Sequence, residues 1–329
     1  MVKHILFGIL GFLIILQLGI FVYREETAEW KSYQATYYKK LAEVTGDVRI
    51  AQTPLSVNQV WDKNLNRADR CTTCHLGIAN PAFENEPQPY TTHPHFKDGG
   101  YISKHAFEKF GCTICHEGNG QAVTVAATHG VVKHLDRQPL SGPYVQTACT
   151  KCHYELYARE VYWPEADVLM QGKTLAYELG CGACHAIRQF GTTAVLAPEI
   201  SNMGSKTELA FTLVHDFSQI ESGEHITRVW EWEHFKDPQK IVPGSPDAPD
   251  PKDRTSPTIM PNWGLTDEEI TALTVFTLSL RDPVVENIPP QYFPKIASHD
   301  GFLQYEVDKL IGRRDPSFFT RNGIMPYGE

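Results

Sequence analysis

Apolar residues form one long run at the N-terminus of the chain. The run from Ile5 to Val22 covers 18 residues and is interrupted only by Gln17 and three glycines. As a helix it would measure about 27 Å, close to the roughly 30 Å of a bilayer core. The pattern predicts one N-terminal transmembrane helix within residues 1–23.

A cleaved signal peptide is the alternative interpretation of this run, because a positively charged start precedes it. No small-residue cleavage pattern follows, since the run ends in Phe21-Val22-Tyr23-Arg24. We therefore expect a retained anchor and, from Tyr23 to about Leu41, a helix leaving the membrane. Its aromatic residues either lie at the membrane interface or pack against a neighbour. They are Trp30, Tyr33, Tyr37 and Tyr38.

Two later segments show helical spacing. Residues 166–179 predict a helix that leads directly into Cys181. Residues 266–269, Thr-Asp-Glu-Glu, form a capping box that predicts the start of a second helix. That helix carries one apolar face, made of Ile270, Leu273, Phe276 and Leu280. A proline-rich loop over 237–261 separates the two helices, and the tail from Asp282 is again proline-punctuated.

The segment 71–153 has a different texture, with short apolar stretches and frequent Gly, Pro, His and Asn. So little apolar chain cannot form a conventional core. The whole pattern predicts a mainly α-helical protein with much irregular structure. The predicted parts are an anchor (1–23), a connector (24–70), a first module (71–163), an α-helical domain (164–282) and an extended tail (283–329).

Composition excludes some classes of protein. The length of 329 residues suggests about two soluble domains. A formal net charge of −9 argues against a nucleic-acid partner, because phosphate recognition needs clustered Lys and Arg. Ordinary hydrophobicity and charge exclude disorder over the whole chain.

All eight cysteines lie in four Cys-x-x-Cys-His pentapeptides. Two thiols three residues apart can form thioethers with the two vinyl groups of one haem, and the adjacent histidine supplies the proximal ligand. A zinc ribbon does not need a histidine after each pair, and a thioredoxin-like site needs a βαβ pattern that is missing here. The pentapeptides are Cys71/Cys74/His75, Cys112/Cys115/His116, Cys149/Cys152/His153 and Cys181/Cys184/His185.

The four pentapeptides resemble those of multihaem c-type cytochromes. The resemblance implies four covalently bound haem c groups, held by the eight cysteines and ligated by the four histidines. In that group haem is attached on the outer side of the energy-conserving membrane. We therefore expect a single-pass protein of the cytoplasmic membrane, with its haem domains on the periplasmic side.

Ten of the fourteen histidines lie outside the pentapeptides, and five of these fall between residues 93 and 134. Chance would place only one or two there. We therefore expect bis-histidine ligation of the first three haems, without assigning a histidine to a particular iron. The candidates are His93, His95, His105, His129 and His134.

Residues 166–281 resemble a monohaem class I cytochrome c domain. The resemblance is carried by Gly172-Lys173, by the fourth pentapeptide, by Ala197-Pro198-Glu199-Ile200 and by residues 259–269, which begin Ile-Met-Pro-Asn-Trp-Gly. It implies Met260 as the distal ligand, the Pro198 carbonyl as an acceptor from the proximal histidine, and a close helix crossing at Gly172 near Phe276. The remaining thioethers considered are Met170, Met203 and Met325, and core packing is the expected role of the first two.

Together these features predict a membrane-anchored tetrahaem c-type cytochrome with a C-terminal class I domain. Thioether ligation raises the potential of haem iron relative to two imidazoles, so electrons would run from the first three haems to the fourth. The expected donor is a quinol-oxidising, cytochrome b-like or Rieske-type membrane assembly. The acceptor would be a soluble c-type cytochrome or another carrier with a cationic face.

Other functions stay open at this point. One is an autonomous tetrahaem quinol dehydrogenase, and another is the cytochrome c subunit of a terminal reductase. A reductase with one substrate-open iron is a third. The tetrahaem subunit of photosynthetic reaction centres is disfavoured, because that family places methionines ahead of most sites and this chain has none between Val2 and Leu169.

Overall fold

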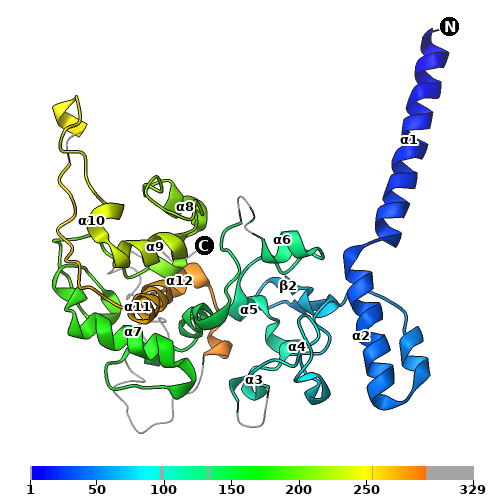
Figure 1. Cartoon of the computed structure of the whole chain (residues 1–329), viewed down its shortest axis with the longest axis horizontal. Coiled ribbons are helices and arrows are strands. Elements are labelled where there is room, and N and C mark those ends of the chain that lie inside the picture. Colours follow the sequence, from blue (N-terminus) through cyan, green and yellow to red (C-terminus); the bar gives the residue numbers. More distant parts are fainter. Residues whose placement is uncertain (1, 97–99, 131, 133–134, 254, 294–329) are drawn as a thin grey trace. The chain divides into compact units, whose positions relative to one another are not determined.

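The computed structural model describes residues 2–96, 100–130, 132, 135–253 and 255–293 (Figure 1). Within them the chain is mainly helical, as predicted, and its one sheet is a two-stranded antiparallel hairpin. Contacts divide the chain into two compact units. Unit 1 comprises Met1–Asp62, Asn66–Cys112 and Asn119–Val131, and unit 2 comprises Lys63–Leu65, Thr113–Gly118 and Val132–Glu329. The first pentapeptide lies in unit 1, the third and fourth lie in unit 2, and the division falls inside the second.

Figure 1 shows the N-terminal helix α1, Val2–Glu26, as one long helix. None of its side chains is buried. It is long and apolar enough to cross a membrane, by length and composition. An apolar surface of this extent is stable only in lipid or against another protein. Helix α2, Glu29–Thr45, follows after a break at residues 27–28, so the predicted continuous helix from Tyr23 is interrupted there.

The aromatic residues of α2 pack inside unit 1. Tyr37 is buried and its ring lies 5.1 Å from that of Phe83, with Tyr90 in the same cluster. Gln34 is also buried, and its amide donates to the carbonyl oxygens of Ser56 at 2.6 Å and Thr73 at 3.0 Å. The sequence left two interpretations open for these aromatic residues, the membrane interface or packing against a neighbour. Tyr37 packs against neighbouring residues.

The rest of unit 1 is built from short elements. Strands β1 and β2 pair antiparallel, with Trp61 opposite Ala68. The elements are η1 (Val48–Gln52), β1 (Val60–Asp62), β2 (Arg67–Asp69), η2 (Cys71–Thr73), η3 (Pro81–Phe83), α3 (Tyr101–Lys104), α4 (Phe107–Phe110) and α6 (Val125–His129).

Unit 2 contains the longer helices of the C-terminal half. Its α-helices are α5 (Thr113–His116), α7 (Asp167–Glu178), α8 (Glu208–Thr212), α9 (Thr227–Lys236), α10 (Pro238–Ile241), α11 (Asp267–Ser279) and α12 (Pro283–Glu286). Its 3-10 turns are η4 (Gly142–Lys151), η5 (Tyr154–Tyr157), η6 (Pro164–Ala166), η7 (Cys181–Ala183), η8 (Arg188–Phe190), η9 (Met203–Ser205), η10 (Pro251–Asp253) and η11 (Pro290–Tyr292). The predicted loop over 237–261 therefore contains one short helix and one turn.

Helices α7 and α11 cross at Gly172, which confirms the close approach expected there. A Cβ atom on Gly172 would lie 1.9 Å from the carbonyl oxygen of Ala272 and 2.8 Å from Cβ of Phe276. Only a residue without a side chain fits between the two backbones, so Gly172 sets the distance between the helices.

Helix α11 begins at the predicted capping box, where Thr266 and Glu269 exchange side-chain and backbone hydrogen bonds. The sequence predicted that only one apolar face of this helix would be buried. In the structure nearly every residue from Ile270 to Ser279 is buried, so the helix is enclosed on all sides. Helices α7 and α9 and turn η4 all contact α11. Its hydroxyl groups donate to carbonyl oxygens of its own preceding turn, as Thr274 does to Ile270 at 2.8 Å.

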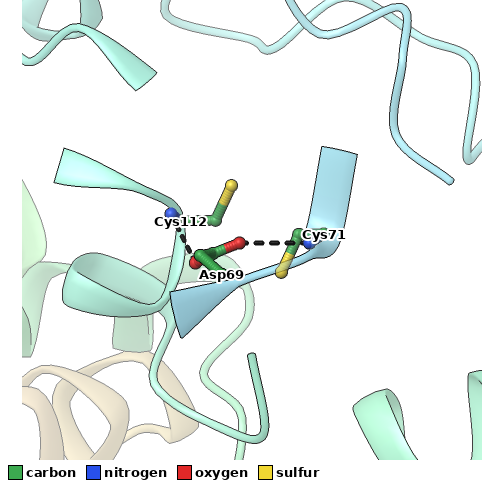
Figure 2. A group of neighbouring side chains, drawn as sticks. All are labelled: Asp69, Cys71 and Cys112. Atoms are coloured by element: carbon green, nitrogen blue, oxygen red, sulfur yellow. Dashed lines mark hydrogen bonds between the residues drawn. The ribbon is translucent and has the colours of Figure 1, made fainter. Parts of the chain in front are cut away.

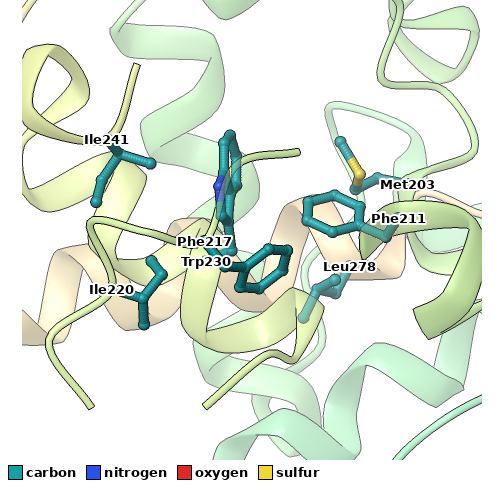
Figure 3. Packing of buried hydrophobic residues seen from close by; sticks show 7 residues of the cluster. All are labelled: Met203, Phe211, Phe217, Ile220, Trp230, Ile241 and Leu278. Carbon is teal, nitrogen blue, oxygen red and sulfur yellow. The ribbon is translucent and has the colours of Figure 1, made fainter. Parts of the chain in front are cut away.

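An apolar cluster fills the space between α8, α9, α10 and α11 (Figure 3). Phe211 and Trp230 lie at its centre with their rings edge to face, 5.4 Å apart. The members of the cluster are Met203, Phe211, Phe217, Ile220, Trp230, Ile241 and Leu278.

A cluster of five charged side chains is also largely buried in unit 2. Glu117 contacts Lys151 and Arg281 at 3.0 Å and Arg137 at 3.4 Å. Glu286 accepts from both nitrogens of the Arg137 fork, at 2.8 and 2.9 Å, and contacts Arg281 at 3.2 Å. Burial alone would raise the pKa of Glu117, but the three cations outweigh it and hold that pKa at about 2. Both carboxylates are therefore ionised at neutral pH.

Candidate haem-attachment sites

Each pentapeptide forms a single tight turn. The turns lie at η2, at α5, at the end of η4 and at η7. In the first, third and fourth pentapeptides, the backbone N–H of the histidine donates to the backbone carbonyl oxygen of the first cysteine. The distances are 3.0, 2.9 and 3.0 Å. Residues i, i+3 and i+4 of a helical turn share one face. Both sulfur atoms and the imidazole therefore project from the same side, as attachment to one macrocycle requires.

The pentapeptide histidines His116, His153 and His185 each have a protein oxygen within hydrogen-bonding distance of Nδ1. A ligating imidazole usually donates its other N–H to such an acceptor, which fixes the ring and turns Nε2 toward the metal. The acceptors are the Leu140 carbonyl for His116 (3.1 Å), Oε1 of Glu155 for His153 (2.7 Å) and the Pro198 carbonyl for His185 (2.7 Å). The last is the contact that the class I resemblance implied.

Asp69 joins the first and second pentapeptides inside unit 1 (Figure 2). Its carboxylate accepts from the backbone N–H of Cys71 at 3.1 Å and of Cys112 at 2.7 Å. The carboxylate and both sulfur atoms lie within 4.8 Å of one another. Three donors fall short of the four ligands of a structural zinc site. The main consequence is that the first cysteines of the first two pentapeptides are neighbours.

The second and third pentapeptides are neighbours inside unit 2. Burial raises the pKa of Cys149 and of Cys152 to about 12, and the nearby Cys115 adds to both shifts. Burial likewise raises the pKa of Cys181 to about 11. Such surroundings favour the neutral thiol over the thiolate at these three cysteines.

The third pentapeptide is tied to the closing helix of the predicted class I domain. Thr150, inside that pentapeptide, donates to the carbonyl oxygen of Ser279 in α11 at 2.7 Å, and the Tyr157 hydroxyl donates to the same oxygen. From α7, the ammonium of Lys173 donates to the carbonyls of Leu156 and Ala158 at 3.0 and 2.8 Å. The third and fourth attachment sequences therefore share one packed framework.

Among the distal candidates, His129 lies beside a proximal histidine. The ring centroids of His75 and His129 are 5.9 Å apart. With metal–nitrogen bonds of about 2 Å, two imidazoles on opposite faces of one iron place their centroids roughly 6 Å apart. The separation therefore matches a bis-histidine pair.

The other candidates are not placed so clearly. His105 holds the Tyr101 carbonyl at 2.7 Å from Nδ1, the contact typical of an oriented imidazole. His93 and His95 have their rings 6.2 Å apart, and His95 lies against Tyr101. His134 is outside the described residues.

At the fourth pentapeptide, Met260 lies next to a histidine that the sequence did not single out. Sδ of Met260 is 3.1 Å from Nε2 of His234 in α9. Burial lowers the pKa of His234 to about 4, with smaller contributions from His185 and His215, so the imidazole is neutral at physiological pH. Because His185 contributes to this pKa shift, the pentapeptide histidine lies close enough to interact electrostatically with His234.

Two of the other methionines pack in the protein interior. Met170 and Met203 are buried in the core of unit 2, which confirms their expected packing role. Met325 is outside the described residues.

Three residues of these sites were missed by sequence reasoning: Asp69, Glu155 and His234. Asp69 and Glu155 lie two residues from Cys71 and His153, a spacing at which a carboxylate commonly accepts a local hydrogen bond. That spacing could have identified them. No spacing marks His234, because its neighbour Met260 is 26 residues away in the chain.

Comparison with protein-family models, curated proteins and solved structures found no match to this chain. The geometry of its own residues therefore carries the functional argument.

Proposed function

We propose that this protein is a membrane-anchored tetrahaem c-type cytochrome that transfers electrons within a respiratory membrane complex. One observation carries the proposal: every cysteine belongs to a Cys-x-x-Cys-His turn that puts two sulfur atoms and an imidazole on one side. The donor set fits haem c, since His116, His153 and His185 each have Nδ1 beside an acceptor. Burial also favours the neutral thiol at Cys149.

Haem c would supply a one-electron iron couple at each attachment sequence. His75, His116, His153 and His185 would be the proximal ligands. His129 would oppose His75, as their 5.9 Å separation supports. Distal ligands for the second and third haems would come from the other candidates, His93, His95, His105 and His134, and Met260 would serve the fourth.

The order of the attachment sequences supports a continuous path. Asp69 holds Cys71 beside Cys112, Cys115 lies near Cys149 and Cys152, and Thr150 bonds to α11. Neighbouring attachment points bring neighbouring macrocycles close. Because a thioether ligand raises the potential relative to imidazole, electrons would move toward the fourth haem.

The apolar α1 supports membrane attachment. The haem domains would lie on the periplasmic side, because multihaem c-type cytochromes receive their haem there. The anchor would keep the chain near its donor and raise the effective concentration of the two. We propose a cytochrome b-like, quinol-oxidising membrane subunit as that donor. A soluble c-type cytochrome or similar carrier would be the acceptor, with a cationic face that complements the net charge of −9.

A haem count tests the chemistry. The pyridine haemochrome assay on purified protein should give four haems per chain. The variant with Cys181→Ser and Cys184→Ser should give three, and His225→Ala, which changes an exposed histidine, should still give four. Two or fewer haems in the unaltered chain, or zinc in their place, would refute the proposal.

Purification in mild detergent tests the partners. Membrane subunits that oxidise quinol should co-purify with the chain, and quinol should reduce its haems only when those subunits are present. Quinol oxidation by the isolated chain would instead identify an autonomous quinol dehydrogenase.

A further inference from the structure

His234 and Met260 form a close pair at the fourth attachment sequence. Nε2 of His234 lies 3.1 Å from Sδ of Met260, within hydrogen-bonding distance of a sulfur acceptor. We propose that His234 is a positioning residue for the fourth haem, donating its Nε2–H to the thioether sulfur while that sulfur ligates the iron. The inference rests on the proposed function, because it requires haem c at Cys181 and Cys184.

The two bonds to sulfur are compatible. A thioether sulfur has two lone pairs, so one can bind the iron while the other accepts the hydrogen bond. A methionine side chain has three rotatable bonds and adopts many conformations when nothing holds it. The hydrogen bond selects the conformation in which the sulfur stays near His234.

The opposite reading, in which His234 itself ligates the iron, fits the surroundings of the ring less well. Nδ1 of His234 is buried and has no hydrogen-bond partner within the described part of the chain. Ligation through Nε2 would put the single proton of a neutral imidazole on Nδ1, and a buried N–H without an acceptor is rare. His116, His153 and His185 differ, because each has an acceptor at Nδ1. With the proton on Nε2, only a lone pair is left unpartnered.

The ring of His234 is held in place by aromatic packing. It stacks on Trp230 at 4.7 Å with 15° between the planes, and Trp230 donates from Nε1 to the Asp216 carbonyl at 2.9 Å. His215 lies on the same indole at 4.6 Å, but its Nδ1 is 2.9 Å from the Phe211 carbonyl. A fixed ring keeps the N–H aimed at the sulfur in both oxidation states.

The donor should raise the potential of the fourth haem. A hydrogen bond to sulfur withdraws electron density that would otherwise stabilise ferric iron, so its loss favours oxidation. A neutral hydrogen bond changes an equilibrium by several-fold to about tenfold. For a one-electron couple, tenfold corresponds to about 59 mV.

The experiment compares four variants of the full-length, haem-loaded protein: three at His234 and His215, and Met260→Leu, which removes the proposed thioether ligand. His234→Phe keeps a ring on Trp230 but has no N–H. His234→Gln restores an amide N–H at the position of Nε2. His215→Phe is the matched control, because His215 contacts the same indole while its Nδ1 lies against the Phe211 carbonyl. Potentials are measured by spectroelectrochemistry, and near-infrared magnetic circular dichroism identifies the axial ligands of each ferric haem.

If the inference holds, His234→Phe should lower the reduction potential of the methionine-ligated haem. The expected decrease is up to about 59 mV, which corresponds to a several-fold to tenfold change in the equilibrium constant for reduction. His234→Gln should recover most of the loss, and His215→Phe should match the unaltered protein. An unchanged potential in His234→Phe would overturn the inference. So would a bis-imidazole signature at the fourth haem that persists in Met260→Leu. A chain that carries no haem on the peptide containing Cys181 and Cys184 refutes the proposed function itself, and mass spectrometry of that peptide separates the two failures.

Discussion

Replacing Gly172 by alanine tests the helix crossing that frames the fourth attachment sequence. The added Cβ would lie 1.9 Å from the Ala272 carbonyl oxygen, whereas non-bonded carbon contacts are favourable near about 3.5 Å. The obstacle is backbone, which cannot rotate away, so α7 and α11 must separate. Overpacking of this kind costs about 3 kcal/mol, and alanine regains about 1 kcal/mol through its higher helix propensity. The net loss should be about 2 kcal/mol.

Circular dichroism of the full-length protein in detergent measures the effect as a shift in the thermal transition. For a domain of this size, a loss of 2 kcal/mol lowers Tm by roughly 4–8 °C. Gln171→Ala is the matched control, since residue 171 is exposed on the same helix and should shift Tm little. An equal or higher Tm in Gly172→Ala would show that the helices do not meet as described.

Three further predictions concern charge, pH and ligation. Glu286→Gln removes one of the two buried carboxylates that contact Arg281, leaves Glu117 as the other, and deprives Arg137 of its two-point partner. It should cost about 3 kcal/mol in denaturant unfolding; a loss below 1 kcal/mol would contradict the buried pairing. Burial raises the pKa of Glu231 to about 7. The folded state therefore holds a proton that the unfolded state releases near 4.5, and stability should fall as pH rises from about 4.5 to 7. Glu231→Gln should flatten that dependence in urea titrations at several pH values, and an unaltered slope would assign it to another group. His129→Ala should make one ferric haem high-spin in electron paramagnetic resonance, whereas a spectrum with four low-spin haems would exclude His129 as the partner of His75.

Local sequence patterns predicted several elements correctly. The run from Ile5 to Val22 gave α1, and the segment 166–179 gave α7. The capping box at Thr266 and Glu269 lies at the start of α11. These features depend on residues a few positions apart, whose interactions are the same in any tertiary setting. The break between α1 and α2 and the burial of α11 on all sides were missed, because packing against distant segments decides both.

The chemistry proposed for the four pentapeptides rests on the sequence alone, because the spacing that would let two sulfur atoms and one imidazole meet a macrocycle is contained in five consecutive residues. The neighbours of each pentapeptide were not readable. Asp69 between Cys71 and Cys112, His129 beside His75, and His234 against Met260 are juxtapositions across many residues of chain. Only the tertiary structure decided them, since short turns with few local constraints take their positions from long-range packing and buried hydrogen bonds.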